Sequence, residues 1–197
     1  MSPWVLATRN AGKLKEFQRL LLPLGHEILS QEALGIPEAP EPHCTFLENA
    51  LGKARQASAL SGYPALADDS GLCVEALEGA PGVISAHFAG EPRSDQRNNE
   101  KLVRLLHEQS NRRAHYYCIL IWIRHAEDPT PLIAEGRWEG EIQLSAQGTG
   151  GFGYDPYFYV PALGCTAAEL TLAQKNQISH RGQALQHLLS QLQKVHG

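Results

Sequence analysis

The sequence has little of what covalent cross-linking or zinc binding requires. It holds four cysteines in 197 residues, and no two of them form a C-x-x-C pair. A disulfide framework needs several cysteines in a short chain, and a zinc site needs paired cysteine or histidine ligands. Neither pattern is present, so the thiols are predicted to be reduced. They are Cys44, Cys73, Cys118 and Cys165.

The sequence also lacks long apolar runs and an excess of positive charge. No stretch approaches the roughly 18 apolar residues of a membrane span, and no basic N-terminal region precedes an apolar run as in a signal peptide. A cytoplasmic protein is therefore expected. The net charge of −4 disfavours a nucleic-acid-binding module, which would need a basic stripe. A few lysines gathered in one place would still hold a small anionic substrate.

The length is that of one domain, in which predicted strands and helices alternate. We expect a single domain over residues 1–197, with room for a small inserted lobe. Apolar runs and helical spacing predict the elements, and their alternation indicates an α/β class with a mixed sheet. The predicted strands are 4–7, 26–29, 65–67, 115–124 and 133–144, and the predicted helices begin near residues 13, 45, 95 and 180.

The loop after the first predicted strand is a candidate phosphate-binding segment. A helix N-terminus presents unpaired N–H groups and a partial positive charge, so anions bind there readily. Lys13 adds a full charge one turn into the helix. The spacing is not that of the G-x-x-x-x-G-K-[ST] phosphate loop, and an ordinary capped helix with an exposed lysine is the alternative. The segment consists of Thr8, Arg9, Asn10, Ala11, Gly12 and Lys13.

Two adjacent acids follow the predicted strand 65–67. Asp68 and Asp69 would point to opposite faces of that strand and so have different roles. An acid at a strand terminus in an α/β sheet is well placed to hold Mg²⁺ against phosphate oxygens. Asp, Ser and Gly are also frequent in turns, so Asp69-Ser70-Gly71 as a plain turn is the alternative. Charge repulsion between neighbouring carboxylates favours the functional interpretation.

Another acid and a lysine flank a predicted helix start. Thr45 and Glu48 have the S/T-x-x-E spacing of a capping box, which already explains Glu48. Glu41, in a proline-rich loop, has no such explanation, and Lys53 lies on the following helix. Taken singly, Glu41 and Lys53 are typical of solvated surface charges.

A glycine-rich loop carries a candidate base-binding segment, Phe152-Gly153-Tyr154-Asp155. Aromatic side chains at an exposed loop tip can stack on a base, and a carboxylate can accept a hydrogen bond from a purine ring N–H. The alternative is a tight glycine turn whose aromatic side chains return to the core.

Positive side chains cluster where the last helix should begin. Ser179 can cap that helix, with His180 and Arg181 in its first turn and Lys175 just before it. Positive charge at a helix N-terminus opposes the macrodipole. It becomes favourable if an anion or an electron-rich base edge binds there, so we interpret this segment as functional.

Together these segments resemble the inosine triphosphate pyrophosphatase family, also called the dITP/XTP pyrophosphatases. The similarity spans nearly the whole chain in order, and the stretch from Arg124 to Pro129 is similar to that of bacterial members. The matching motifs are Leu6-Ala7-Thr8-Arg9-Asn10-Ala11-Gly12-Lys13, Thr45-Phe46-Leu47-Glu48-Asn49-Ala50, Ala67-Asp68-Asp69-Ser70-Gly71-Leu72, Gly79-Ala80-Pro81-Gly82-Val83, Gly150-Gly151-Phe152-Gly153-Tyr154-Asp155-Pro156 and Ser179-His180-Arg181-Gly182.

The resemblance implies a homodimer of α/β subunits with a mixed central sheet flanked by helices, in two lobes with a nucleotide cleft between them. It implies Mg²⁺-dependent hydrolysis of ITP, dITP and XTP to the monophosphate and pyrophosphate, which removes them from the nucleotide pool before incorporation into DNA or RNA. Residues 8–13 and Lys53 would hold the phosphates. Glu41 and Asp69 would coordinate Mg²⁺, with Asp69 also the proton acceptor and Asp68 in support.

The resemblance also assigns the base site. Ser70 would contact the substrate, Phe152 and Tyr154 would frame the base, and its polar edge would be recognised by Asp155, Lys175, His180 and Arg181. Two positions depart from the family pattern. Arg9 replaces a glycine often found between Thr and Asn, and His43 stands beside Glu41 where many members have glycine. A pyrophosphatase for modified pyrimidines and a nucleotide sensor without turnover remain alternatives.

Overall fold

The structure is a computed structural model that describes residues 3–8, 13, 14, 17, 18, 21, 25 and 27–196. The predicted first helix falls largely outside this set, although the described residues between 13 and 21 are helical and Phe17 and Leu21 are fully buried. Within the described residues, no helix is long and apolar enough to cross a membrane.

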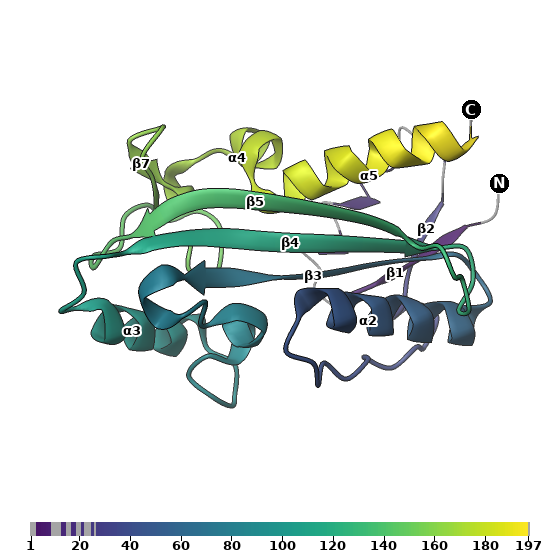
Figure 1. Cartoon of the computed structure of the whole chain (residues 1–197), viewed down its shortest axis with the longest axis horizontal. Coiled ribbons are helices and arrows are strands. Elements are labelled where there is room, and N and C mark those ends of the chain that lie inside the picture. Colours follow the sequence, from purple (N-terminus) through teal and green to yellow (C-terminus); the bar gives the residue numbers. More distant parts are fainter. Residues whose placement is uncertain are drawn as a thin grey trace. The chain divides into compact units, whose positions relative to one another are not determined.

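A mixed seven-stranded sheet flanked by helices forms the fold, which confirms the predicted α/β class (Figure 1). Its order is β2-β1-β3-β4-β5-β6-β7; β1 is parallel to β2 and β3, whereas β6 is antiparallel to β5 and β7. The strands are β1 (Trp4–Ala7), β2 (Ile28–Ser30), β3 (Ala65–Val74), β4 (Arg113–Ile123), β5 (Leu132–Ile142), β6 (Phe158–Val160) and β7 (Cys165–Thr166).

The helices begin where side-chain caps allow. Thr45 caps α2 by accepting from the Glu48 N–H at 3.2 Å, and Gly62 ends it in a left-handed conformation with φ 72°. Only this half of the predicted capping box is formed, and the Glu48 carboxylate accepts from the Thr45 hydroxyl at 2.5 Å. The helices are α2 (Phe46–Ser61), α3 (Asp95–Leu106), α4 (Leu172–Ile178) and α5 (His180–His196), with 3₁₀ turns η2 (Glu75–Leu77), η3 (Gly82–His87) and η4 (Ala167–Glu169).

Two compact units divide the chain, and each is built from separate segments. The first comprises Met1–Asp69, Ile119–Ala134 and His187–Gly197. In it α2 packs against β1 (Figure 1), and Trp4 contacts Trp122 with ring centroids 5.3 Å apart. The end of α5 is tied to the start of β5 by a hydrogen bond from Gln191 Nε2 to the Ile133 carbonyl at 2.8 Å.

The second unit comprises Ser70–Cys118 and Glu135–Gln186 and has its own aromatic core. Tyr116, Trp138 and Phe158 pack together there, with centroid distances from 4.6 to 6.2 Å. Leu102 and Leu106 of α3 are fully buried in the same core. This core supports the polar groups of the second unit described below.

The third strand corrects one prediction. The sequence predicts that it ends before Asp68, but β3 runs from Ala65 through both acids to Val74. Asp68 and Asp69 are only 2% and 5% exposed. Buried carboxylates are tolerated in a strand when cations lie against them, and lysines contact both acids.

Candidate functional site

A group of acids and lysines lies in the first unit, and we call it the acid–lysine cluster. Its members are Lys13, Glu41, Lys53, Asp68 and Asp69. Lys13 Nζ lies 2.6 Å from Asp68 Oδ2. Lys53 Nζ lies 3.4 Å from Asp69 Oδ1, contacts Glu41 Oε1, and donates to the Asp68 carbonyl at 3.1 Å. The tertiary structure therefore brings together five residues that the sequence singled out separately.

Neighbouring acids in β3 have different lysine partners, as expected for residues that alternate between the faces of a strand. Asp68 binds Lys13, whereas Asp69 binds Lys53. Glu41 and Lys53 taken singly resembled surface charges. In the structure they contact each other, and the Lys53 side chain is only 12% exposed.

Burial governs the electrostatics of Asp69. Loss of solvent raises the pKa of its carboxyl group from 3.8 to about 6; Lys53 opposes the rise, while Glu41 and Asp68 add to it. For Lys53, burial lowers the pKa, but the carboxylates of Asp69, Asp68 and Glu41 outweigh that effect and raise it overall. Asp69 can thus take up and release a proton near neutral pH.

The same cluster has the donor atoms that a magnesium site needs. Among the described residues, no three carboxylate, histidine or cysteine side chains converge to form a metal site by themselves. Glu41 and Asp69 nevertheless reach a common cationic atom, Lys53 Nζ. Mg²⁺ is usually held by one or two carboxylates, with water and phosphate oxygens as its other ligands. Two carboxylates reaching one point fit that pattern.

The phosphate-binding candidates are only partly described. Thr8 directly follows β1, as predicted, and Lys13 lies in helical conformation close to β3. Arg9, Asn10, Ala11 and Gly12 lie outside the described residues.

A second group of candidate residues lies in the second unit, and we call it the Asp155 cluster. Its members are Phe152, Asp155, Lys175, His180 and Arg181. Asp155 is 3% exposed. Its Oδ2 atom accepts from Lys175 Nζ at 2.5 Å and from the Phe152 N–H at 2.9 Å, and its Oδ1 atom accepts from the Tyr116 hydroxyl at 3.3 Å. Three protein donors therefore hold this carboxylate, and one of them is the Lys175 ammonium.

The two aromatic residues of the glycine-rich loop have different environments. Phe152 is 48% exposed, with Lys175 Nζ 5.2 Å and Arg181 Cζ 5.9 Å from its ring centroid. Tyr154 is buried, and its hydroxyl donates to the Ser85 carbonyl at 2.7 Å. The prediction of an exposed aromatic holds for Phe152, whereas Tyr154 returns to the core.

The start of α5 brings the basic residues into this unit. Ser179 Oγ accepts from the Gly182 N–H at 3.2 Å and so caps the helix, as predicted. His180 and Arg181 are buried, and Arg181 Nη2 lies 3.5 Å from Ser70 Oγ. Lys175 lies on α4, a helix that was not predicted from the sequence. Thr171 and Gln174 form its capping box, a local signal that could have indicated it.

Glycines permit this close packing. A Cβ on Gly136 of β5 would lie 1.9 Å from the His180 carbonyl oxygen, and one on Gly182 would lie 2.0 Å from that of Asn176. A Cβ on Gly151, where φ is +74°, would lie 2.1 Å from Asp155 Oδ2. Each position needs glycine because backbone or carboxylate atoms occupy the space of a side chain.

Three residues that the sequence did not indicate hold the Asp155 cluster in place. Tyr116 binds Asp155, Asn99 Nδ2 donates to the Gly153 carbonyl at 2.8 Å, and Asp95 Oδ2 accepts from the Gly153 N–H at 2.9 Å. None stands near the motifs in sequence. Tyr116 follows the ordinary alternation of a strand and carries no signal of its own.

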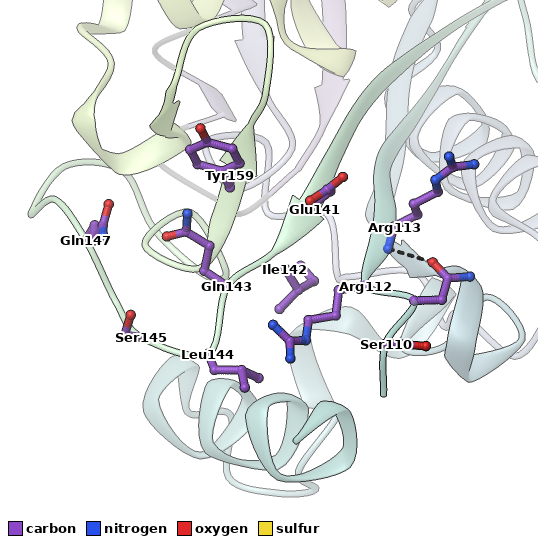
Figure 2. Close-up of a pocket in the computed structure, with 11 residues that line it drawn as sticks. Ser110, Arg112, Arg113, Glu141, Ile142, Gln143, Leu144, Ser145, Gln147 and Tyr159 are labelled. Carbon is purple, nitrogen blue, oxygen red and sulfur yellow. Dashed lines mark hydrogen bonds between the residues drawn. The ribbon is translucent and has the colours of Figure 1, made fainter. Parts of the chain in front are cut away.

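A pocket of about 940 Å³ in the second unit lies apart from these residues (Figure 2). Arg112 and Arg113 line it, and on the other side lie Gln143, which directly follows β5, and Tyr159 of β6. The Arg113 N–H donates to Asn111 Oδ1 at 3.1 Å, the bond drawn in Figure 2. Of the described candidate site residues, none lines this pocket, so its size does not identify it as the functional site.

The sequence of this chain matches a known protein family over most of its length. The Ham1 family profile matches residues 4–191. The chain therefore belongs to the Ham1 family.

Relatives of known sequence and structure agree. The chain is 60% identical to the dITP/XTP pyrophosphatase of Nitrosomonas europaea over 192 residues, covering 98% of this chain and 95% of that relative. It is 61% identical to the protein of the same name from Chromobacterium violaceum, covering 97% of each. The solved structure of a HAM1 protein from Coxiella burnetii has a TM-score of 0.94 at 45% identity, covering 98% of this chain and 100% of that one. These similarities confirm the resemblance drawn from the motifs.

Proposed function

We propose that this protein hydrolyses non-standard purine nucleoside triphosphates, dITP, XTP and ITP, to the nucleoside monophosphate and pyrophosphate. The observation that carries the proposal is the contact of Lys53 with two carboxylates, that of the buried acid Asp69 and that of Glu41. Two such carboxylates can hold Mg²⁺, and one of them can accept a proton from water. The names of the relatives supply the substrate class.

The charges of the acid–lysine cluster support a requirement for a divalent cation. Lys13 and Lys53 contribute two positive charges, whereas Glu41, Asp68 and Asp69 contribute three negative ones when all are ionised. Such a cluster would repel a triphosphate. We propose that Glu41 and Asp69 would hold Mg²⁺, which would offset phosphate charge and act as a Lewis acid on phosphate oxygens.

The side chains then have distinct roles in the reaction. Asp69 accepts a proton from the attacking water as the water oxygen bonds to the α-phosphorus. The bond from the α-phosphorus to the bridging oxygen breaks, and pyrophosphate leaves with the electron pair. Lys13 and Lys53, with residues 8–12, bind the phosphates and stabilise the charge that develops on the leaving group. Asp68 orients Lys13 through the 2.6 Å contact.

The Asp155 cluster accounts for recognition of the base. The half-exposed ring of Phe152 offers a surface on which a purine can stack. Lys175, His180 or Arg181 donates a hydrogen bond to a carbonyl at purine position 6, and Ser70 contacts the substrate beside Arg181. Adenine has an amino group at that position, which would leave a donor unpaired at a cost of about 1–3 kcal/mol.

Product analysis with ITP and Mg²⁺ tests the proposal, with GTP and ATP as controls. IMP and pyrophosphate from ITP, with little product from GTP or ATP, are expected; because guanine also has a carbonyl at position 6, rejection of GTP has to come from its 2-amino group. IDP and phosphate would mean attack at the γ-phosphorus and would refute the mechanism. Absence of turnover would favour a nucleotide sensor.

We further propose that the protein is a cytoplasmic homodimer and that residues 1–197 form one functional domain. The unit boundaries fall within β3, β4, β5 and α5, so neither unit is a continuous stretch of chain. Light scattering after gel filtration tests the dimer, and a single unfolding transition in urea tests the domain. A monomeric mass or two separate transitions would refute the respective statement.

A further inference from the structure

Tyr116 is a core residue of β4 whose hydroxyl group is not explained by packing alone. Its ring lies among Trp138 and Phe158, with centroids 6.2 and 4.6 Å away. A phenylalanine would fill that space equally well. The hydroxyl group and a stacked contact with His180 point instead toward the Asp155 cluster.

The hydroxyl group of Tyr116 is a fixed donor to Asp155. Burial raises the pKa of Tyr116 well above 10, and the Asp155 charge raises it further, so the group stays protonated. It donates to Asp155 Oδ1 at 3.3 Å, while Asp155 Oδ2 accepts from Lys175 Nζ at 2.5 Å. Together with the Phe152 N–H, which donates to Oδ2 at 2.9 Å, this bond fixes the rotation of the carboxylate and hence the position of the oxygen to which Lys175 is bound.

The ring of Tyr116 also orients His180. The two rings are nearly parallel, with an interplanar angle of 11° and centroids 4.8 Å apart, and Trp138 lies 6.5 Å from His180 at 15°. Gly136 lets the His180 backbone approach β5, because any Cβ there would overlap the His180 carbonyl oxygen. The helix start and the aromatic stack together define where the imidazole lies.

We propose that Tyr116 is a positioning residue for base specificity: it orients Lys175 through Asp155 and His180 through ring stacking. The inference rests on the proposed function, in which Lys175 and His180 are candidate donors to the carbonyl at purine position 6. Tyr116 itself touches neither the phosphates nor the acid–lysine cluster in this role. Its loss therefore affects recognition of the base more than the chemical step.

The test is Tyr116→Phe, with Tyr117→Phe as its matched control. Tyr117 neighbours Tyr116 in β4 and also donates to a carboxylate, Glu135 Oε2 at 2.6 Å, but this carboxylate lies outside the Asp155 cluster. The kinetic constants kcat and KM are measured for ITP, together with kcat/KM for ATP. Tyr116→Phe is expected to raise KM for ITP about tenfold with little change in kcat, and to lower the ITP-over-ATP ratio similarly. Tyr117→Phe should match the wild type.

The outcomes separate this inference from the proposed function. Wild-type conversion of ITP to IMP with an unaltered KM in Tyr116→Phe overturns the positioning role alone. Equal losses in kcat for ITP and ATP, with an unchanged ITP-over-ATP ratio, also overturn it, because they indicate a general structural defect. No ITP turnover by the wild type overturns the proposed function and this role together. A second variant, Tyr116→Leu, removes the stack as well and should raise KM further than Tyr116→Phe.

Discussion

Replacing Asp69 by asparagine should stabilise the metal-free protein while abolishing its activity. Burial raises the pKa of this carboxyl group from 3.8 to about 6, even though Lys53 lies against it. The fold therefore favours the neutral form of the side chain. Asparagine has nearly the same shape and carries no charge, so Asp69→Asn removes the unfavourable charge and also removes the general base.

The size of the effect follows from the pKa. A rise from 3.8 to about 6 corresponds to about 3 kcal/mol of unfolding free energy. Between about pH 4 and pH 6 the folded protein retains this proton and the unfolded chain does not, so this group's contribution falls as pH rises through that window. Above pH 6 the whole cost is present. For a chain of this length, about 3 kcal/mol corresponds to roughly 6–12 °C in Tm.

Urea unfolding of wild type and Asp69→Asn at pH 5 and pH 8, with EDTA present, measures this directly. The variant should be more stable at pH 8, and its advantage should shrink at pH 5. Asp128→Asn is the control with the opposite sign. Hydrogen bonds from Arg124 hold the pKa of Asp128 well below its ordinary value, so its charged form is favoured in the fold and its loss should destabilise at pH 8. An Asp69→Asn protein less stable than wild type at pH 8 would refute the reasoning.

Three further predictions follow from the same contacts. Gly136→Ala should destabilise the protein by more than the roughly 1–3 kcal/mol typical of overpacking, because the added Cβ would lie 1.9 Å from a backbone oxygen. Gly52→Ala, in α2 with open space around it, should stabilise the protein by up to about 1 kcal/mol. Chemical denaturation measures both changes in the free energy of unfolding. Lys53→Met should lower kcat/KM for ITP about a hundredfold or more, with Lys53→Arg recovering part of it in the pyrophosphate-release assay; equal activity in Lys53→Met would contradict its phosphate role. Arg112→Gln, in the pocket of Figure 2, should leave ITP kinetics unchanged, and a tenfold rise in KM would place substrate there instead.

Much of the architecture was predictable because it depends on local interactions. The apolar run at Trp4–Ala7 forms β1, and the helix at Phe46–Ser61 begins at its predicted cap and ends at a glycine. Such features depend on residues within one or two turns of each other, whose propensities and caps can be read along the chain. The family motifs likewise indicate the substrate class, because each is a short contiguous stretch of sequence.

Only the tertiary structure decided the partners of the charged side chains. Asp68 and Asp69 were expected at the end of a strand, but they lie inside β3. Their lysine partners come from distant parts of the sequence: Lys13 is 55 residues from Asp68, and Lys53 is 16 residues from Asp69. Tyr116 reaches Asp155 across 39 residues of sequence. Contacts between distant segments, and the burial they create, have no signature in local sequence. For that reason the raised pKa of Asp69 and the support of the Asp155 cluster by Tyr116 emerge only when the chain is folded.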